Sequence, residues 1–451
     1  MLDGTSSTAH RPDPAAAMSS PDERAADSAV ETAGQAAQGA AGDLAGAPAA
    51  QLDGALRAIA ARLDERAAQV MAANDEDVTA ARAEALPQAF VDRLLLGPDR
   101  LHAMSGQLLA LADAPAGPGR TAIRELPGGL VLQEWRRPVG VIGASFEARP
   151  NVVIDVASQL IKSRNAGVLR TGSSALRSAS VLIDEVVGPA LRDSGLSPEA
   201  IQLIRVPGHA AAYALVRHPE LLPLVILRGS GDTTRALARE GALHGVRILA
   251  HADGGAVIYL DESADPVLAS RLIEASLDRL GVCNRLNLLL VQQAIWPAML
   301  PRIEEVTARL GIATSLPPHS HALGHEWALD SGHEATITVA PVTGARDAAE
   351  LANAETSGLA ASVITEDTAA ARQFLEAYRG TGAFWNATPR LLDGFKLLSL
   401  PETGINIDAV PGPRGPVTFL DLYLRQYAVL PKAEAAGLAA AGQAQSPGNP
   451  G

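Results

Sequence analysis

A single cysteine, Cys283, is the side chain of this sequence best suited to covalent chemistry. It lies in the segment Gly281-Val282-Cys283-Asn284, between an expected helix over residues 265–280 and an apolar run over residues 286–292. The N–H groups of a turn and a nearby helix end can stabilise its thiolate, which is the nucleophilic form. A lone cysteine is more often a small buried apolar residue. The residues alone therefore leave a nucleophile and a core residue as alternatives.

A polar cluster, Arg149-Pro150-Asn151, follows the apolar run over residues 139–145, where a helix is expected to begin. In open α/β sheets, ligands bind beyond the carboxyl ends of the strands. An asparagine at that place can donate its side-chain N–H to a developing oxyanion. It can equally cap the helix, with the proline as a turn residue. Both interpretations stay open.

Two glycine-containing turns each end an expected strand and open a helix. They are Arg170-Thr171-Gly172-Ser173 and Arg228-Gly229-Ser230-Gly231. Glycine lets the backbone approach a phosphate, and a helix N-terminus attracts anions. The two arginines can add positive charge. Neither turn has a dinucleotide or nucleoside-triphosphate fingerprint, so plain loops are the alternative.

Histidines gather in a proline-containing segment that looks metal-like. They are His319, His321, His325 and His333. No cysteine or well-placed carboxylate completes a tetrahedral set, so we expect a solvated insertion and no metal site. Asn386, Glu402 and Arg414 are loop residues when judged from the sequence alone.

The elements that must position these residues alternate between strand and helix from residue 139 onward. That alternation predicts parallel, doubly wound sheets, and a second alternation begins at residue 286. Before it, helical spacing starts near residue 51, and residues 121–137 form two alternating runs around Pro127-Gly128-Gly129, which indicates a hairpin. Residues 1–48 and 432–451 are rich in Ala, Gly, Ser and Pro, so we expect disordered tails.

Composition excludes several classes of protein. The 451 residues include 47% hydrophobic side chains, which is enough for a large core. The net charge of −13 disfavours nucleic-acid binding, and one cysteine excludes an intrachain disulfide. No apolar run approaches the roughly 20 residues of a membrane helix, and no signal peptide is recognised. We therefore expect a cytoplasmic protein with a small-molecule substrate.

These segments, in this order, resemble the γ-glutamyl phosphate reductases, a family within the aldehyde dehydrogenase superfamily. The strongest match covers residues 136–172, where EARPNV followed by DVAS is characteristic of the family. Arg279 with Cys283-Asn284 is similar to the family's R-P-S-x-C-N. The segment AFWNATPRLLDG over residues 383–394 is similar to its V-N-A-S-T-R-F-x-D-G-G. The resemblance extends over roughly residues 51–431.

The resemblance implies an aldehyde dehydrogenase-like α/β fold and an oxidoreductase of proline biosynthesis. It implies that residues 49–120 and 138–255 bind the dinucleotide and that residues 256–400 are catalytic. It implies that the hairpin 121–137, with part of 405–431, joins subunits of a homo-oligomer. The reaction implied is the NADPH-dependent reduction of L-glutamate 5-phosphate to L-glutamate 5-semialdehyde through a cysteine thioester.

The same resemblance gives roles to single residues. Cys283 would be the nucleophile and Asn151 the oxyanion donor. The two glycine turns, residues 170–173 and 228–231, would contact NADP. The expected substrate-binding residues are Arg149, Asn284, Asn386, Glu402 and Arg414.

Departures from the family pattern keep two alternatives open. The family's lysine is missing from Arg170-Thr171-Gly172-Ser173-Ser174, and its histidines are missing from residues 251–261 and 355–363. The first alternative is a related aldehyde or acyl phosphate oxidoreductase with a changed substrate. The second is a non-catalytic, oligomeric relative that binds a dinucleotide.

Overall fold

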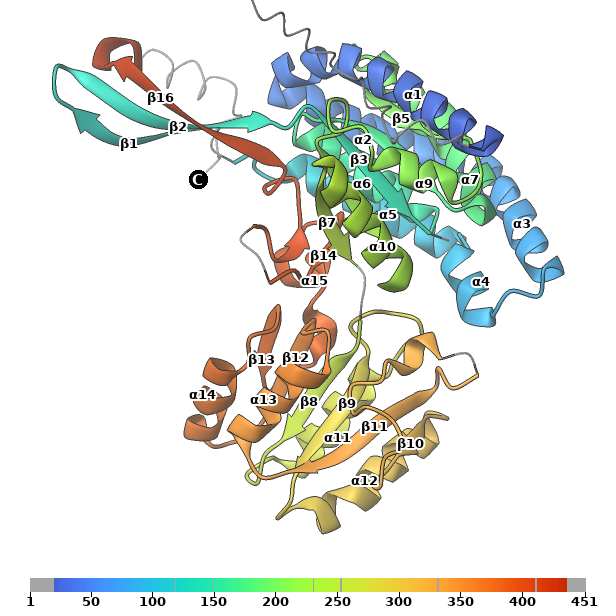
Figure 1. The fold of residues 1–451 in the computed structure, drawn as a ribbon, viewed down its shortest axis with the longest axis vertical. Coiled ribbons are helices and arrows are strands. Elements are labelled where there is room, and N and C mark those ends of the chain that lie inside the picture. Colours follow the sequence, from blue (N-terminus) through green and yellow to red (C-terminus); the bar gives the residue numbers. More distant parts are fainter. Residues whose placement is uncertain are drawn as a thin grey trace, which may run out of the picture.

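Two parallel β-sheets, each covered by helices, and a separate three-stranded arm make up the chain (Figure 1). The computed structural model describes residues 20–117, 119–147, 149–229, 231–251, 254–330, 332–409 and 412–435. Both sheets confirm the doubly wound α/β prediction, because every strand pair within them is parallel.

The first sheet has the strand order β5-β4-β3-β6-β7. Its strands are β3 (Val141–Phe146), β4 (Ala166–Thr171), β5 (Ile201–Leu203), β6 (Leu224–Arg228) and β7 (Arg247–His251). The central strand β3 is buried along its whole length, which explains its unbroken apolar sequence. The chain order reverses between β3 and β6, and such a switch point opens a crevice at the carboxyl ends of the strands.

Helices pack closely on this sheet. Those that contact its strands directly include α1 (Pro21–Gly46), α6 (Asn151–Lys162), α9 (Ala210–Leu215) and α10 (Gly231–His244), while α2 (Ala49–Glu65) and α5 (Pro98–Asp113) pack on α6. A Cβ at Gly167 of β4 would lie 2.3 Å from Leu160 Cδ1 of α6, so glycine lets this helix approach the strand. The helix therefore has a fixed position, and its first turn carries Asn151.

The second sheet has the order β10-β11-β9-β8-β12-β13. Its strands are β8 (Ala256–Leu260), β9 (Leu286–Gln292), β10 (Ala313–Ser315), β11 (Thr336–Val342), β12 (Ala360–Ile364) and β13 (Gly382–Trp385). Its helices are α11 (Pro266–Ser276), α12 (Trp296–Arg309), α13 (Ala345–Glu355) and α14 (Thr368–Ala377). The amino ends of β8 and β9 face the carboxyl ends of β3 and β6, since Gly254, Cys283, Arg149 and Arg228 line one cavity.

The arm confirms the predicted hairpin and adds a strand to it. β1 (Arg120–Leu126) and β2 (Leu130–Pro138) are antiparallel, and β16 (Tyr423–Pro431) pairs with the other edge of β2. Gly128 and Gly129 have φ values of +79° and +70°, a conformation that favours glycine in the turn. Figure 1 shows the arm projecting from the half that contains the first sheet.

The predicted N-terminal tail is wrong for residues 21–46, which form the helix α1 (Pro21–Gly46). Ser20 caps the helix in a reciprocal arrangement with Glu23, and its buried stripe consists mainly of small side chains. The buried residues are Ala26, Val30, Ala33, Gly34, Ala37, Ala40 and Leu44. They recur every three or four positions, which is helical spacing. Alanine and glycine in a long apolar stripe therefore explain why composition suggested a tail.

The remaining elements connect these layers. They are α3 (Ala67–Ala83), α4 (Gln88–Leu94), α7 (Leu176–Val181), α8 (Gly188–Asp193), α15 (Gly394–Leu398), β14 (Gly404–Asn406) and β15 (Gly415–Val417). Residues 1–19 and 436–451, which include part of the first predicted tail and most of the second, lie outside the described residues. Among the helices of the described ranges, none is long and apolar enough to cross a membrane.

Candidate active site

Cys283 lies in the turn between α11 and β9, and its backbone packs against the entry to β8. Its carbonyl oxygen accepts a hydrogen bond from the N–H of Gly255 at 2.8 Å. A Cβ at Gly254 would lie 2.9 Å from Cys283 Cα and 2.8 Å from its carbonyl oxygen. The cysteine turn is therefore seated directly on a glycine backbone, which fixes the position of the half-buried thiol.

Two cavities, of about 390 Å³ and 320 Å³, open on this cysteine. Six residues line both of them: Arg93, Arg149, Arg228, Gly281, Val282 and Cys283. Such a reacting group can be approached by one molecule from each cavity. We refer to the larger as the first cavity and to the smaller as the second.

Positive charge dominates the first cavity. Seven cationic side chains line it: Arg93, Arg100, Arg149, Arg228, Arg279, Arg390 and Lys396. Three carboxylates accompany them: Asp155, Asp393 and Glu402. An excess of cations in a cleft attracts and retains an anionic small molecule.

The charges around Cys283 act on its thiol in opposite directions. Burial raises the pKa of the thiol, and Glu402 and Glu326 raise it further. Arg149 and Arg228 lower it, because a guanidinium group stabilises the thiolate. These two arginines are thus the groups that favour the nucleophilic form.

Asn151 is the first residue of α6, and its side chain is held by the next turn of the same helix. Its Nδ2 donates to Oδ2 of Asp155 at 3.0 Å. Burial raises the pKa of Asp155 to about 6, while Arg228 and the Asn151 bond oppose that rise. Both side chains line the first cavity with Cys283. An amide has two N–H groups, so one remains for a ligand.

Glu402 lies between α15 and β14 and also reaches the first cavity. Its Oε2 accepts the N–H of Gly394 at 2.6 Å. Burial raises the pKa of Glu402 to about 7, although Arg228 lowers it. This carboxyl group can therefore hold or release a proton near neutral pH.

Asn284, the neighbour of the cysteine, lines the first cavity but uses its amide to build the wall. Its Nδ2 donates to Leu392 O at 2.9 Å, and its Oδ1 accepts from Arg390. Arg390 in turn is paired with Asp278 at 2.8 Å. The structure thus gives Asn284 a positioning role beside the expected substrate.

Two expected substrate residues are not brought to Cys283. Asn386 lies at the carboxyl end of β13 and exchanges hydrogen bonds with the backbone of Thr365. Arg414 donates to the carbonyl oxygens of Arg379 and Ile407. Neither belongs to the linings of the two cavities, so the structure does not bring these two expected residues to the site. Their similarity to family motifs suggested a role in substrate binding, but their polar groups form hydrogen bonds with nearby backbone atoms.

The second cavity has features that fit a nicotinamide dinucleotide. Gly229 lines it, and a Cβ there would lie 3.2 Å from Glu147 Cδ, so a larger residue would crowd the Glu147 side chain where a ligand can approach the backbone. Outside the lining of this cavity, at the carboxyl end of β4, Thr171 Oγ1 and Arg170 Nε are buried without a hydrogen-bond partner among the described residues. Gly172 and Ser173 continue that turn, and Ser230 lies outside the described residues.

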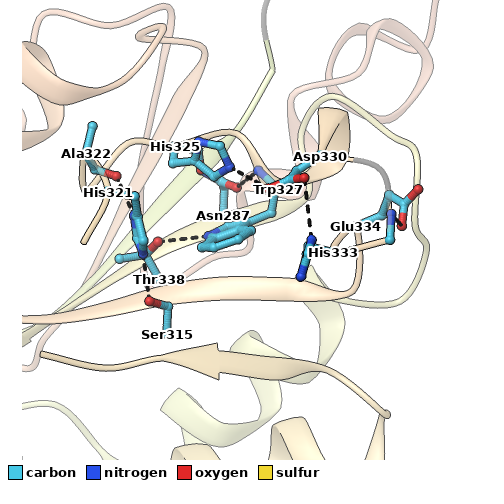
Figure 2. Close-up of polar contacts among 11 residues, drawn as sticks. Asn287, Ser315, His321, Ala322, His325, Trp327, Asp330, His333, Glu334 and Thr338 are labelled. Carbon is cyan, nitrogen blue, oxygen red and sulfur yellow. Dashed lines mark hydrogen bonds and ion pairs between the residues drawn. The ribbon is translucent and has the colours of Figure 1, made fainter. Parts of the chain in front are cut away.

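The histidine-rich segment forms one wall of the second cavity. Figure 2 shows His325 and His333 both reaching Asp330, at 3.1 Å and 3.5 Å. Asn287 anchors the segment through the backbone of His325 and Trp327. Asn287 thus ties the segment to the second sheet, while the described side chains of the segment are half-exposed or exposed.

The other two histidines belong to the same segment. Ser315 bonds His321 at 2.7 Å, and the rings of His319 and His321 lie 5.3 Å apart. Within the described ranges, no group of three or more His, Cys, Asp or Glu could hold a metal ion.

Four side chains that line these cavities were not identified as site residues from the sequence. Arg93 and Arg100 come from α4 and the first turn of α5, while Asp155 and His251 come from α6 and β7. Burial lowers the pKa of His251 to about 3, with Arg228 adding to the effect, so its ring is neutral. Asp155 lies four residues after Asn151 and so on the same helix face, which is a signal that the sequence did carry.

The fold and the cysteine between two cavities define an aldehyde dehydrogenase-type protein. The family model described as "Aldehyde dehydrogenase family" matches residues 8–322 of the chain. Cys283 and both glycine turns fall within that match.

More specific similarity comes from named relatives. Gamma-glutamyl phosphate reductase of Aeromonas salmonicida (strain A449) is 32% identical over 406 residues, covering 87% of this chain and 96% of the relative. The protein of that name from Gluconobacter oxydans (strain 621H) is 34% identical, covering 84% and 88%. The crystal structure of gamma-glutamyl phosphate reductase from Thermotoga maritima superposes with a TM-score of 0.80 at 27% identity, covering 89% and 98%. The chain belongs to the gamma-glutamyl phosphate reductase family.

Proposed function

We propose that this protein reduces L-glutamate 5-phosphate to L-glutamate 5-semialdehyde and phosphate, with NADPH as the reductant, in proline biosynthesis. The observation that carries the proposal is the position of Cys283 between a strongly cationic cavity and a second, glycine-lined cavity. The substrate carries a phosphate and a carboxylate, so its charge suits the first cavity. Family membership supports the same reaction.

The first chemical step uses Cys283 as the nucleophile. Its Sγ forms a bond to the acyl carbon, and the bond between that carbon and the phosphate oxygen breaks. The phosphate leaves with the electron pair, and a thioester remains. Arg149 and Arg228 favour the thiolate that starts the step.

Asn151 stabilises the oxyanion of the tetrahedral intermediate. Its amide is oriented by Asp155, and the backbone N–H of Cys283 is the expected second donor. Preorganised donors of this kind typically account for a 10²–10³-fold effect on kcat (about 2.7–4 kcal/mol).

A bound nicotinamide dinucleotide supplies hydride, which no side chain can do. The residues proposed to hold it are the turns 170–173 and 229–231, at the carboxyl ends of β4 and β6. When the thiohemiacetal collapses, the C–S bond breaks and the electron pair returns to Sγ of Cys283. The same two arginines stabilise the thiolate that is released.

The organisation of the chain follows from this proposal. Residues 49–120 and 138–255 hold the dinucleotide, and residues 256–400 carry the cysteine. The arm is proposed to join subunits of a homo-oligomer, and the protein is proposed to act in the cytoplasm. The exposed apolar side chains Leu424, Tyr427 and Val429 on β16 support a role of the arm in assembly.

The experiment that tests the function is the reverse reaction. Purified protein is mixed with glutamate 5-semialdehyde, phosphate and either NADP or NAD, and reduced nicotinamide is followed by absorbance. Phosphate-dependent reduction, faster with NADP, is the expected result. Reduction with other aldehydes but not with this one would instead favour a changed substrate. Dinucleotide binding without turnover would favour a non-catalytic relative.

A further inference from the structure

Two guanidinium groups, those of Arg149 and Arg228, flank Cys283. Arg149 and Arg228 both line the first and the second cavity, and both contribute to the electrostatics of the thiol. In the described part of the chain, neither forms an ion pair with Asp or Glu. The hydrogen bond of Arg149 goes to a carbonyl oxygen, that of Gly281 at 3.5 Å.

The fold forces these two cations together. Arg228 is the last residue of β6 and pairs in register with Phe146, the last residue of β3. Arg149 follows Phe146 by three positions, and its bond to Gly281 ties it to the cysteine turn. The two arginines therefore lie at the switch point of the first sheet, next to the thiol of Cys283, which precedes strand β9 of the second sheet. Ligands bind at such a point in open α/β sheets.

Two positive charges held close together raise the free energy of the protein unless an anion lies between them. Burial and the charge of Arg228 lower the pKa of Arg149 to about 10. Arg228 also acts on Asp155, His251 and Glu402, so it is central to the site's electrostatics. A dianion with several acceptor oxygens would relieve the repulsion and satisfy both planar donor groups.

We propose that Arg149 and Arg228 form the phosphate site of the enzyme, holding the phosphoryl group of the acyl phosphate beside Cys283 and selecting phosphate as the acyl acceptor in the reverse direction. This inference rests on the proposed function for its substrate, and it assigns Arg228 to phosphate instead of to the dinucleotide. The chemistry recognised is a phosphate dianion, which either the substrate or the phosphates of the dinucleotide can present.

The group transfer balances without a further reactant. In the reverse direction, a phosphate oxygen forms a bond to the thioester carbon, and the C–S bond breaks. The electron pair goes to Sγ, so the products are the acyl phosphate and the Cys283 thiolate. The two arginines neutralise the attacking dianion and then the leaving thiolate, which is why they are needed on both sides of the step.

Kinetics of the reverse reaction test the proposal. Arg228→Gln is expected to raise the KM for phosphate at least tenfold and to leave the KM for the dinucleotide within twofold. Arg228→Lys keeps the charge but loses the planar pair of donors, so its phosphate KM should lie between those of Arg228→Gln and the wild type. Arg239→Gln, on the exposed face of α10, removes the same charge and is the matched control.

A second measurement does not depend on turnover. Iodoacetamide alkylates Cys283, and inorganic phosphate bound at the two arginines should slow that alkylation in the wild type and in Arg239→Gln. In Arg228→Gln the protection should be lost at phosphate concentrations that protect the wild type. A parallel experiment uses NADP without phosphate. NADP should slow the alkylation of Cys283 equally in the wild type and in Arg228→Gln.

The outcomes separate this inference from the function on which it rests. If phosphate protects Cys283 only when Arg228 is present, but the protein does not oxidise glutamate 5-semialdehyde, the phosphate site is supported and the proposed substrate is contradicted. A raised dinucleotide KM with an unchanged phosphate KM would overturn the inference and assign Arg228 to the cofactor. Unchanged phosphate KM and unchanged protection in both Arg228 variants would also overturn it.

Discussion

Nδ2 of Asn151 lies 3.0 Å from Oδ2 of Asp155, one turn further along α6, and both side chains face the cavity that contains Cys283. The carboxylate therefore sets the rotation of the amide, which leaves the second N–H with a defined direction. Asn151→Ala should lower kcat about 10²–10³-fold with little change in KM, because only the transition state carries an oxyanion. Asp155→Asn keeps an acceptor oxygen and should cost less. A loss of threefold or less in Asn151→Ala would show that the oxyanion is held elsewhere.

Cys283→Ala should abolish turnover and leave the fold intact. In the proposed mechanism the thiol forms the covalent bond to substrate, while its removal from a half-buried turn should change the free energy of unfolding by only about 1 kcal/mol. Steady-state assays and urea unfolding of both proteins measure the two effects. Activity above about a thousandth of the wild-type rate would contradict the nucleophile assignment.

Glu402 predicts a specific dependence of stability on pH. Burial raises its pKa from 4.5 to about 7, so the folded state holds this proton more tightly than the unfolded state. Its contribution is therefore fully present below pH 4.5 and is lost as the pH rises through 7, by about 3 kcal/mol at most. Glu402→Gln should lack this loss.

Urea unfolding at several pH values between 4.5 and 8 measures that difference. The stability of wild type relative to Glu402→Gln should fall across the range. Glu304→Gln, on the exposed face of α12, is the matched control and should run parallel to the wild type. Parallel curves for Glu402→Gln as well would mean that the carboxyl group is ionised in both states.

The helix α1 gives a pair of substitutions with opposite expected signs. Leu44 is fully buried, so Leu44→Ala should destabilise the protein by about 2–5 kcal/mol. Gly39 lies on the exposed face with open space around its Cα, so Gly39→Ala should stabilise it by about 0.5–1 kcal/mol. Chemical denaturation measures both. If neither changes stability, this segment does not pack as a helix.

The edge strand β16 should contribute to assembly. Its exposed Tyr427 and Val429 would be covered in an oligomer, and a charge at either site opposes edge pairing. Val429→Lys should therefore lower the molar mass in solution, as measured by light scattering after size-exclusion chromatography. Leu243→Lys, on α10 and 82% exposed, should leave the mass unchanged. If Val429→Lys has the same molar mass as the wild type, the arm is not part of the subunit interface.

The sequence predicted the sheets, the hairpin and the region around Cys283, because those features depend on local periodicity and turn residues. It did not predict that α1 packs on the core, since an apolar face built from alanine resembles low-complexity sequence. Nor did local patterns reveal Arg93 or Arg100, which reach the cavity because α4 packs against α3 and α5 packs against α6. Asn386 and Arg414 matched family motifs, yet their polar atoms bond to nearby backbone.

A thiol with two separate approaches has a kinetic consequence. Because the first and second cavities share only the cysteine turn and the side chains of Arg93, Arg149 and Arg228, the acylated enzyme can retain its acyl group while the molecule in the other cavity is replaced. Exchange of spent for fresh dinucleotide would then need no release of the acyl chain. The thioester intermediate would then have its own lifetime. Its hydrolysis by water, and not the order in which the ligands bind, would limit the fraction of acyl groups that are reduced.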